Sequence, residues 1–192
     1  MIESAARRLA HELVNRREAS IESCPATVCG FGIYKNGEYH DRLFPYDPVP
    51  RIIESDEYDE LEKGLKQRVN ALNAYLKDIY SDKRIIHDGV VPEEYVYTSA
   101  GYFPQVNGVT PPGGIFAHIA GEDLVQGEDG RWWVLEDNLR IPSGASYPLF
   151  VRDIERRISP RLFRDVRIRD NREYPRLLRK AMDFVSTEGI AW

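Results

Sequence analysis

The sequence predicts an α+β fold, with a partly antiparallel sheet and packed helices in a single domain over residues 1–192. Two β-prone segments are each interrupted by a tight-turn dipeptide, Asn-Gly in the first and Asp-Gly in the second. Between them runs a long apolar stripe with helical spacing. At 192 residues and 42% hydrophobic content, the chain is large enough to bury a core of its own.

The first elements follow from local patterns. Apolar residues at helical spacing predict an N-terminal helical arm over about residues 1–20. Strands over 28–34 and 39–44 should form a hairpin, because Asn36-Gly37 favours a type I′ turn.

The most clearly marked helix begins at Asp56, with Ser55 as its N-cap. Its apolar stripe advances in steps of three and four, through Tyr58, Leu61, Leu65, Val69, Leu72, Leu76 and Ile79. Polar residues off that stripe are interpreted as a solvated helix face; they include Lys66, Gln67, Arg68, Asn70 and Asn73. Further along, we expect a short strand over 95–98, a loop over 101–114 and a final amphipathic helix over 174–185.

A second hairpin is predicted from strands near residues 115–125 and 131–139. A two-residue turn at its Asp-Gly dipeptide would place Asp123 directly opposite Glu136. A four-residue turn would make the same two residues diagonal neighbours. Either turn puts both carboxylates on one face, although like charges facing each other across a sheet are destabilising.

This face of the hairpin is a candidate metal site. Because side chains alternate along a strand, Asn138 shares the face of Glu136 while Asp137 points the other way. Two carboxylates and an amide oxygen favour Mg²⁺, which takes oxygen ligands and usually binds together with substrate phosphates. We therefore predict Asp123, Glu136 and Asn138 as metal ligands. The alternative is a solvated acid pair, but the carboxylates lie within apolar runs, where an unpaired charge is costly.

Several sequence blocks carry a resemblance to a known family. They are FPYDPVPRII (44–53), LEKGLKQR (61–68), ALN (71–73), PPGG (111–114), HIAG (118–121) and LEDNLRIPSG (135–144). Together with an acidic residue on one strand and Glu-x-Asn on the next, they resemble the circularly permuted ATP-grasp family of glutathionylspermidine-synthase-like proteins. The resemblance runs from about residue 31 to the C-terminus. It also implies that part of the polar motif on the long helix, which includes Arg68 and Asn73, lies near the active cleft.

The resemblance implies that the chain is part of a circularly permuted ATP-grasp fold with ATP and Mg²⁺ as cofactors. It implies ligation of a small-molecule or peptide carboxylate to an amine through an acyl phosphate. The remaining core strands and the lysines that grip the nucleotide are expected beyond Trp192. The chain would then be the N-terminal, metal-hairpin portion, inactive alone, and a separately encoded second half could be its partner. Glutathionylspermidine synthases proper carry an arginine where this chain has Gly121, which argues against glutathione or spermidine as specific substrates.

The segment after the Glu-x-Asn strand is a candidate anion-binding loop. Arg140 can hold a carboxylate or phosphate through two parallel hydrogen bonds, and we predict it as a catalytic residue. Backbone N–H groups around Ser143, Gly144 and Ser146 could face an anion, aided by a helix that starts near Tyr147. We predict that Arg140 and these three residues bind the nucleotide or the substrate. A turn followed by a helix N-cap is the alternative.

Other patterns argue against several classes of site. The chain has no G-x-x-x-x-G-K-[ST] run, so a P-loop NTPase is not expected. Its four histidines lack metal-ligand spacing. His118 should lie on the face opposite to Asp123 unless a bulge at Gly121 intervenes. A packed core histidine and a catalytic one both stay open.

Charge is unevenly distributed. Residues 152–180 carry eleven Lys/Arg and five Asp/Glu, a local +6, whereas the whole chain has a net charge of −5. This segment is either a solvated helix face or a docking surface. The alternative function is thus a non-catalytic interaction module that docks a partner or nucleic acid, although nucleic acid is not favoured. We expect no secretory signal and no membrane span, and hence a cytoplasmic protein, because residues 1–22 are charged throughout and long apolar runs are absent.

Overall fold

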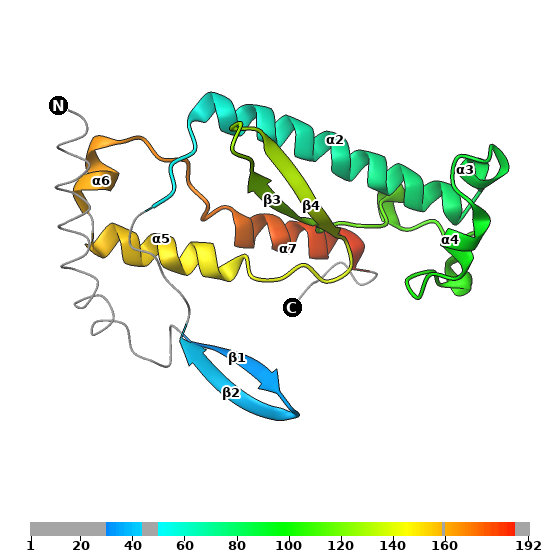
Figure 1. The fold of residues 1–192 in the computed structure, drawn as a ribbon, viewed down its shortest axis with the longest axis horizontal. Helices are drawn as coiled ribbons and strands as arrows, with labels where there is room; N and C mark the ends of the chain where they lie inside the picture. Colours follow the sequence, from blue (N-terminus) through cyan, green and yellow to red (C-terminus); the bar gives the residue numbers. More distant parts are fainter. Residues whose placement is uncertain (1–29, 44–49, 159, 187–192) are drawn as a thin grey trace. The chain divides into compact units, whose positions relative to one another are not determined.

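The computed structural model describes residues 30–43, 50–158 and 160–186 (Figure 1). The chain divides into two compact units. One combines the part up to Ile52 with Gly144–Asp170, and the other combines Ile53–Ser143 with the part from Asn171 onward. The predicted helical arm lies outside the described residues, and the prediction of a single domain stays a prediction.

The first unit contains one hairpin and two helices. Its elements are β1 (Gly30–Lys35), β2 (Glu38–Leu43), α5 (Ser146–Ile158) and α6 (Pro160–Asp165). β1 and β2 pair antiparallel, and Lys35 faces Glu38 at the turn. Asn36 and Gly37 both have positive φ angles, 55° and 83°, as a type I′ turn requires. The first predicted hairpin is therefore confirmed within its described residues.

The second unit contains the remaining elements. They are α2 (Ser55–Ile79), α3 (Arg84–His87), α4 (Glu93–Tyr97), η1 (Pro104–Val106), η2 (Pro112–Gly114), β3 (Gly121–Gln126), β4 (Trp132–Asn138) and α7 (Tyr174–Val185). β3 and β4 form a two-stranded antiparallel sheet alongside α2 (Figure 1). The predicted bounds of the final helix agree with α7.

The long helix α2 begins one residue earlier than predicted. Ser55 is its first helical residue, and Glu54 occupies the N-cap position without a side-chain cap. The apolar stripe is half-buried along most of its length and becomes buried at Ile79. The expected period is thus correct, but α2 packs against a small hairpin that covers only part of the stripe.

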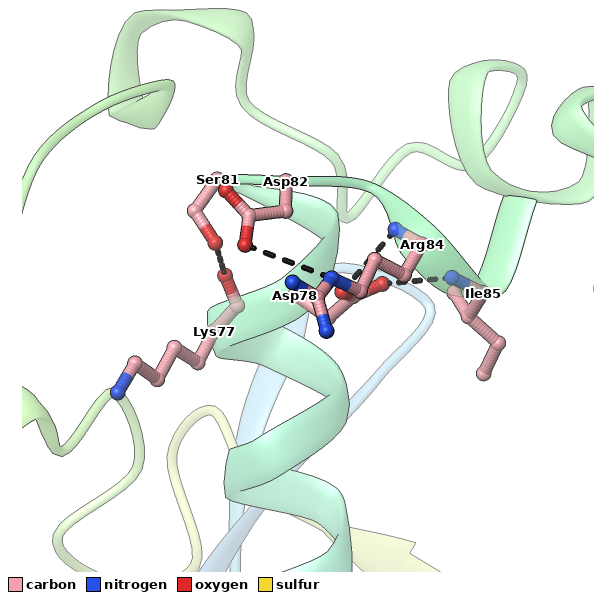
Figure 2. Close-up of polar contacts among 6 residues, drawn as sticks. All are labelled: Lys77, Asp78, Ser81, Asp82, Arg84 and Ile85. Atoms are coloured by element: carbon pink, nitrogen blue, oxygen red, sulfur yellow. Dashed lines mark hydrogen bonds and ion pairs between the residues drawn. The ribbon is translucent and has the colours of Figure 1, made fainter. Parts of the chain in front are cut away.

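A carboxylate near the end of α2 caps the next helix (Figure 2). Asp78 accepts hydrogen bonds from the backbone N–H groups of Arg84, at 3.0 Å, and Ile85, at 2.9 Å. Lys83, just before α3, has a left-handed backbone with a φ of 57°. The carboxylate therefore satisfies two of the orphan N–H groups of the short helix and fixes the sharp change of direction after α2.

The core of the second unit lies where α2 meets α4. Ile79, Tyr80 and Val96 form its buried cluster. The Tyr80 ring stacks on Tyr102 at a centroid distance of 5.3 Å and on Phe116 at 5.8 Å. These contacts hold the segment before β3 close to the end of α2.

The strand predicted over 95–98 is wrong, because this segment is the helix α4. Pro92 precedes it, and two glutamates occupy its first turn, where acidic side chains favour the helix. Val96 is 2% exposed, so tertiary burial outweighs the β-propensity of the neighbouring tyrosines.

The coarse fold class agrees with the prediction, since helices are combined with small antiparallel sheets. In the described part of the chain these are two separate two-stranded sheets. No helix among residues 30–43, 50–158 and 160–186 is both long and apolar enough to cross a bilayer.

Candidate functional site

The candidate site is the hairpin of β3 and β4. Its first strand is shorter than predicted, since residues 115–120 are not in a strand. The positive φ angles of Gly113 and Gly114 and the hydrogen bonds of Phe116 and Ala117 to α2 direct this segment away from strand pairing. β4 lies inside its predicted range.

The turn of this hairpin differs from both predicted turns. The N–H of Gly127 donates to the carbonyl of Arg131 at 2.8 Å, which leaves a loop over residues 128–130. Gly130, its last residue, has a φ of 76°, the left-handed conformation that ends a three-residue hairpin loop. The loop therefore contains an odd number of residues, which changes the register expected for the strands.

If the register of this turn continued, Asp123 would face Leu135, and Glu136 would face Glu122 on the opposite side of the sheet. Instead, a β-bulge shifts the register between Asp123 and Leu124. Leu124 pairs with Val134, and Asp123 pairs with Glu136, so Leu135 is the additional residue. The predicted pairing of the two carboxylates is confirmed, but it arises from the bulge and not from the turn.

The bulge gives the hairpin an outer face that carries the predicted ligands. Asn138 lies two residues beyond Glu136 and opposite Gly121, so it shares the face of Glu136. All three predicted ligands are exposed. Their apolar neighbours on the hairpin are exposed as well, with Leu135 at 70% and Trp133 at 50%.

The exposure corrects one step of the sequence argument. The carboxylates are not buried among apolar residues, so desolvation does not force a cation between them. What favours a cation is their cross-strand pairing, since two like charges directly opposite each other repel.

The donor set of the outer face fits Mg²⁺. It consists of two carboxylates and one amide oxygen, and Mg²⁺ prefers such oxygens while keeping several waters. In the described part of the chain, no group of three or more His, Cys, Asp or Glu side chains is placed to hold a metal. Because the candidate set supplies only three oxygen ligands, it would leave much of the coordination shell of the ion to water or to phosphate oxygens.

The inner face of the hairpin is attached to α2 at its turn end. One oxygen of Glu57 accepts hydrogen bonds from the indole N–H of Trp132, at 2.7 Å, and from the side-chain amide of Gln126, at 3.0 Å. Glu57 lies in the first turn of α2. The contact fixes the distance of the hairpin turn from this helix.

A second attachment lies beside the predicted ligands. Arg68 of α2 donates two hydrogen bonds to Asp137, at 2.5 Å and 2.6 Å. Asp137 is the residue between Glu136 and Asn138, and it faces away from them as predicted. The residues alone placed Arg68 on a solvated face, and the resemblance implied only that part of its motif lies near the active cleft. The pair with Asp137 was not predicted, because its only signal was an acidic residue on the helix side of β4.

The ion pair changes the proton affinity of both groups. The Arg68 guanidinium holds the pKa of Asp137 below its ordinary value, against the opposing effect of partial burial. The hydrogen bonds to Asp137 raise the pKa of Arg68. Both groups are thus charged across the neutral range.

Asn73 of α2 clamps the segment before β3. Its side-chain oxygen accepts hydrogen bonds from the N–H groups of Phe116, at 3.0 Å, and Ala117, at 2.9 Å. Its amide nitrogen donates to the carbonyls of Ala117, at 3.1 Å, and Val69, at 3.2 Å. Sequence reasoning missed this role too, because Asn73 reads as a solvated residue from its place on the helix.

His118 lies in the segment before β3 and not on the strand. Its ring is tilted against Phe184 of α7, with a centroid distance of 6.2 Å. The bulge lies beyond Asp123 and not at Gly121. The Nε2 atom of His118 is buried, and no hydrogen-bond partner is described for it. The contact with Phe184 favours the packed interpretation.

The predicted anion loop is divided between the two units. Arg140 has an exposed side chain in the segment after β4. Ser143 ends the stretch that belongs to the second unit, while Gly144 and Ser146 belong to the first. Ser146 is the first residue of α5, one residue before the predicted start near Tyr147. The roles of all four residues stay predictions.

The basic segment 152–180 uses part of its charge internally. Arg152 donates to the carbonyl of Arg169 at 3.0 Å. Arg156 lies 3.7 Å from Asp153 and 3.9 Å from Asp170. These contacts favour a structural role for the two arginines over a docking surface.

Comparison with known proteins gives a family match. A model described as a circularly permuted ATP-grasp matches residues 50–191, the greater part of the chain. The match includes α2, the metal-site candidate hairpin and α7.

Individual relatives extend this match. An uncharacterised protein of Synechocystis sp. is 44% identical over 145 residues, which are 76% of this chain and 30% of that protein. A Frankia casuarinae protein named “Putative glutamate–cysteine ligase 2-2” is 43% identical over 127 residues, 66% of this chain and 15% of its own. A Frankia alni protein named “Putative glutamate–cysteine ligase 2-3” is 41% identical over 153 residues, 79% and 17% respectively. The chain thus spans less than a third of the length of these relatives.

Proposed function

The chain belongs to the circularly permuted ATP-grasp family, and we propose that it supplies the magnesium-binding part of an ATP-dependent carboxylate–amine ligase. The observation that carries the proposal is the pairing of Asp123 with Glu136, with Asn138 on the same exposed face. The names of the two Frankia relatives support a ligase as the reaction class.

Asp123, Glu136 and Asn138 are the proposed ligands of Mg²⁺. When bound, the ion would neutralise charge on the ATP phosphates, which is the main requirement of phosphoryl transfer. Arg140, Ser143, Gly144 and Ser146 are proposed to orient the carboxylate substrate or a phosphate group, because a guanidinium and backbone N–H groups suit such anions.

The proposed reaction has two steps. A carboxylate oxygen attacks the γ-phosphorus of ATP, and the bond from this phosphorus to the β–γ bridging oxygen breaks. The products are an acyl phosphate and ADP, which is the leaving group. The amine nitrogen then attacks the acyl carbon, loses a proton and releases phosphate. The protein contributes positioning and charge neutralisation.

We propose that further polypeptide completes the ligase, either in one longer chain or as a separately encoded second half. Three oxygen ligands on one hairpin hold Mg²⁺ only weakly, so firm binding requires phosphates gripped from elsewhere. The greater length of the relatives supports this view.

The substrates are proposed to be a small-molecule or peptide carboxylate and an amine, other than glutathione and spermidine. A Cβ atom at Gly121 would lie 2.9 Å from the Cβ of Pro142. The arginine of glutathionylspermidine synthases therefore has no room at this position unless Pro142 shifts.

The test measures MgATP binding by calorimetry and ATP-dependent ligation. The chain alone should bind MgATP weakly and ligate very poorly. Mixed with polypeptide that corresponds to the remainder of the Synechocystis relative, it should bind and turn over. Glu136→Gln should abolish turnover of the mixture, whereas Glu128→Gln, at the hairpin turn, should leave it unchanged.

Two results would contradict the proposal. Robust ligation by the chain alone would show that no further polypeptide is needed. Unchanged turnover in the Glu136→Gln mixture would remove Glu136 from the metal site.

A further inference from the structure

The hairpin has two possible registers near the candidate ligands, and only one of them brings Asp123 and Glu136 together. The turn end pairs Gln126 with Trp132 and Val125 with Trp133. Continued without a bulge, this register would turn Glu136 towards α2. Because side chains alternate, a slip of one residue moves every side chain beyond it to the other face.

The observed register is accompanied by a specific contact on the inner face. The guanidinium of Arg68 donates two hydrogen bonds to the carboxylate of Asp137. Only the bulged register turns Asp137 towards α2. Its side chain is 17% exposed and that of Arg68 is 44% exposed. Glu122, which faces Asp137 across the strands, adds a second negative charge near Arg68.

Without Asp137 paired to Arg68, the same guanidinium would be available to Glu136. Glu136 would reach it in the unbulged register, where it replaces Asp137 on the inner face. In that case the two neighbouring acids would compete for one arginine, and the acid that does not pair with Arg68 would face outward.

We propose that Asp137, held by Arg68, is a positioning residue that keeps the hairpin in its bulged register and thereby turns Glu136 and Asn138 towards Asp123. The positioning role rests on the proposed function only in so far as those three residues bind a cation. The choice of register is a property of the hairpin itself and can be measured without any ligand.

The experiment uses the 192-residue chain and nuclear Overhauser contacts between the two strands. The wild-type chain should show a backbone contact between Asp123 and Glu136. Asp137→Asn should lose this contact and gain one between Asp123 and Leu135, because Arg68 then attracts Glu136. Arg68→Met should weaken the Asp123–Glu136 contact, since nothing then selects between the registers.

Each test variant has a control that removes a charge of the same sign elsewhere and leaves the Arg68–Asp137 ion pair intact. Glu128→Gln removes an exposed carboxylate at the hairpin turn, and Lys63→Met removes an exposed cation of α2 that pairs with Glu60. Both should keep the wild-type contact. The swapped pair Arg68→Asp/Asp137→Arg should restore the contact, which a loss of general stability would not explain.

A wild-type Asp123–Glu136 contact in both Asp137→Asn and Arg68→Met would overturn the proposal. If the single variants do not fold, the swapped pair decides: a restored contact supports the proposal, and its absence overturns it. The metal proposal can fail independently of this one. A wild-type chain that has the bulged register but does not bind Mn²⁺, used in place of Mg²⁺, at the hairpin would contradict only the metal site.

Discussion

Replacement of Asn73 by alanine tests how the segment before β3 is fixed to α2. Besides a hydrogen bond to Val69 within α2, the substitution removes three that hold this segment. Two are accepted from Phe116 and Ala117, and one is donated to Ala117. Ala117 is buried, so its backbone N–H and carbonyl cannot form hydrogen bonds with bulk water after Asn73 is removed.

The expected magnitude follows from these three contacts. At about 0.5–1.5 kcal/mol for each net hydrogen bond, their loss destabilises the fold by about 1.5–4.5 kcal/mol. Since Asn73 itself is half-buried, water can solvate part of the gap, and we expect about 2–3 kcal/mol.

Chemical unfolding and hydrogen exchange of the Phe116 and Ala117 amides provide the assay. Asn73→Asp keeps both accepted bonds and should lose only about 1 kcal/mol. Asn70→Ala, at an exposed position on the same helix, serves as the control and should change little. A loss below about 0.5 kcal/mol in Asn73→Ala, with unchanged exchange at both amides, would refute the clamp.

Three further predictions concern the contacts between α2 and the hairpin. Leu65→Ala should cost about 1–2 kcal/mol of unfolding free energy, less than at a fully buried site, because Leu65 is half-buried and lines open grooves beside the hairpin. The control Leu177→Ala, in α7 at a position 52% exposed, should lose less unfolding free energy. Equal losses in the two variants would show that the apolar stripe of α2 is not packed as described. Glu57→Ala should destabilise the hairpin by about 1–2 kcal/mol, measured by amide exchange in β4, because it removes an acceptor of two side-chain hydrogen bonds. The lowered pKa of Asp137 means that its ion pair stabilises the fold above about pH 3.9 and is lost as the pH falls through the lowered value. Carboxyl NMR titration should show this low pKa moving back towards its ordinary value in Arg68→Met, and an identical titration in both proteins would contradict it.

Local signals predicted much of the fold. Asn36-Gly37 marked the first turn because a type I′ turn needs two positive φ angles, and both are observed. Steps of three and four predicted α2 and α7 because one face of each helix repeats at that spacing.

The pairing of Asp123 with Glu136 was predicted correctly from a wrong turn. An Asp-Gly dipeptide fits a two-residue turn as well as the end of a three-residue loop, so the sequence could not choose between them. The bulge that restores the pairing accompanies a contact between residues that lie far apart in the chain, Arg68 and Asp137. Such contacts leave no periodic signal.

Tertiary contacts also explain the failures nearby. The tyrosines around Val96 favour a strand locally, but burial of Val96 against the end of α2 favours the helix. The strand predicted from residue 115 is shortened because Asn73 takes the backbone groups of Phe116 and Ala117.

The central claim is that Asp123, Glu136 and Asn138 bind a divalent cation on the outer face of the hairpin. The most direct measurement is paramagnetic broadening of the NMR signals of the chain by Mn²⁺, used in place of Mg²⁺. We predict broadening centred on these three residues, lost in Glu136→Gln and kept in Glu128→Gln. Broadening centred on other carboxylates, or unchanged in Glu136→Gln, would contradict the claim.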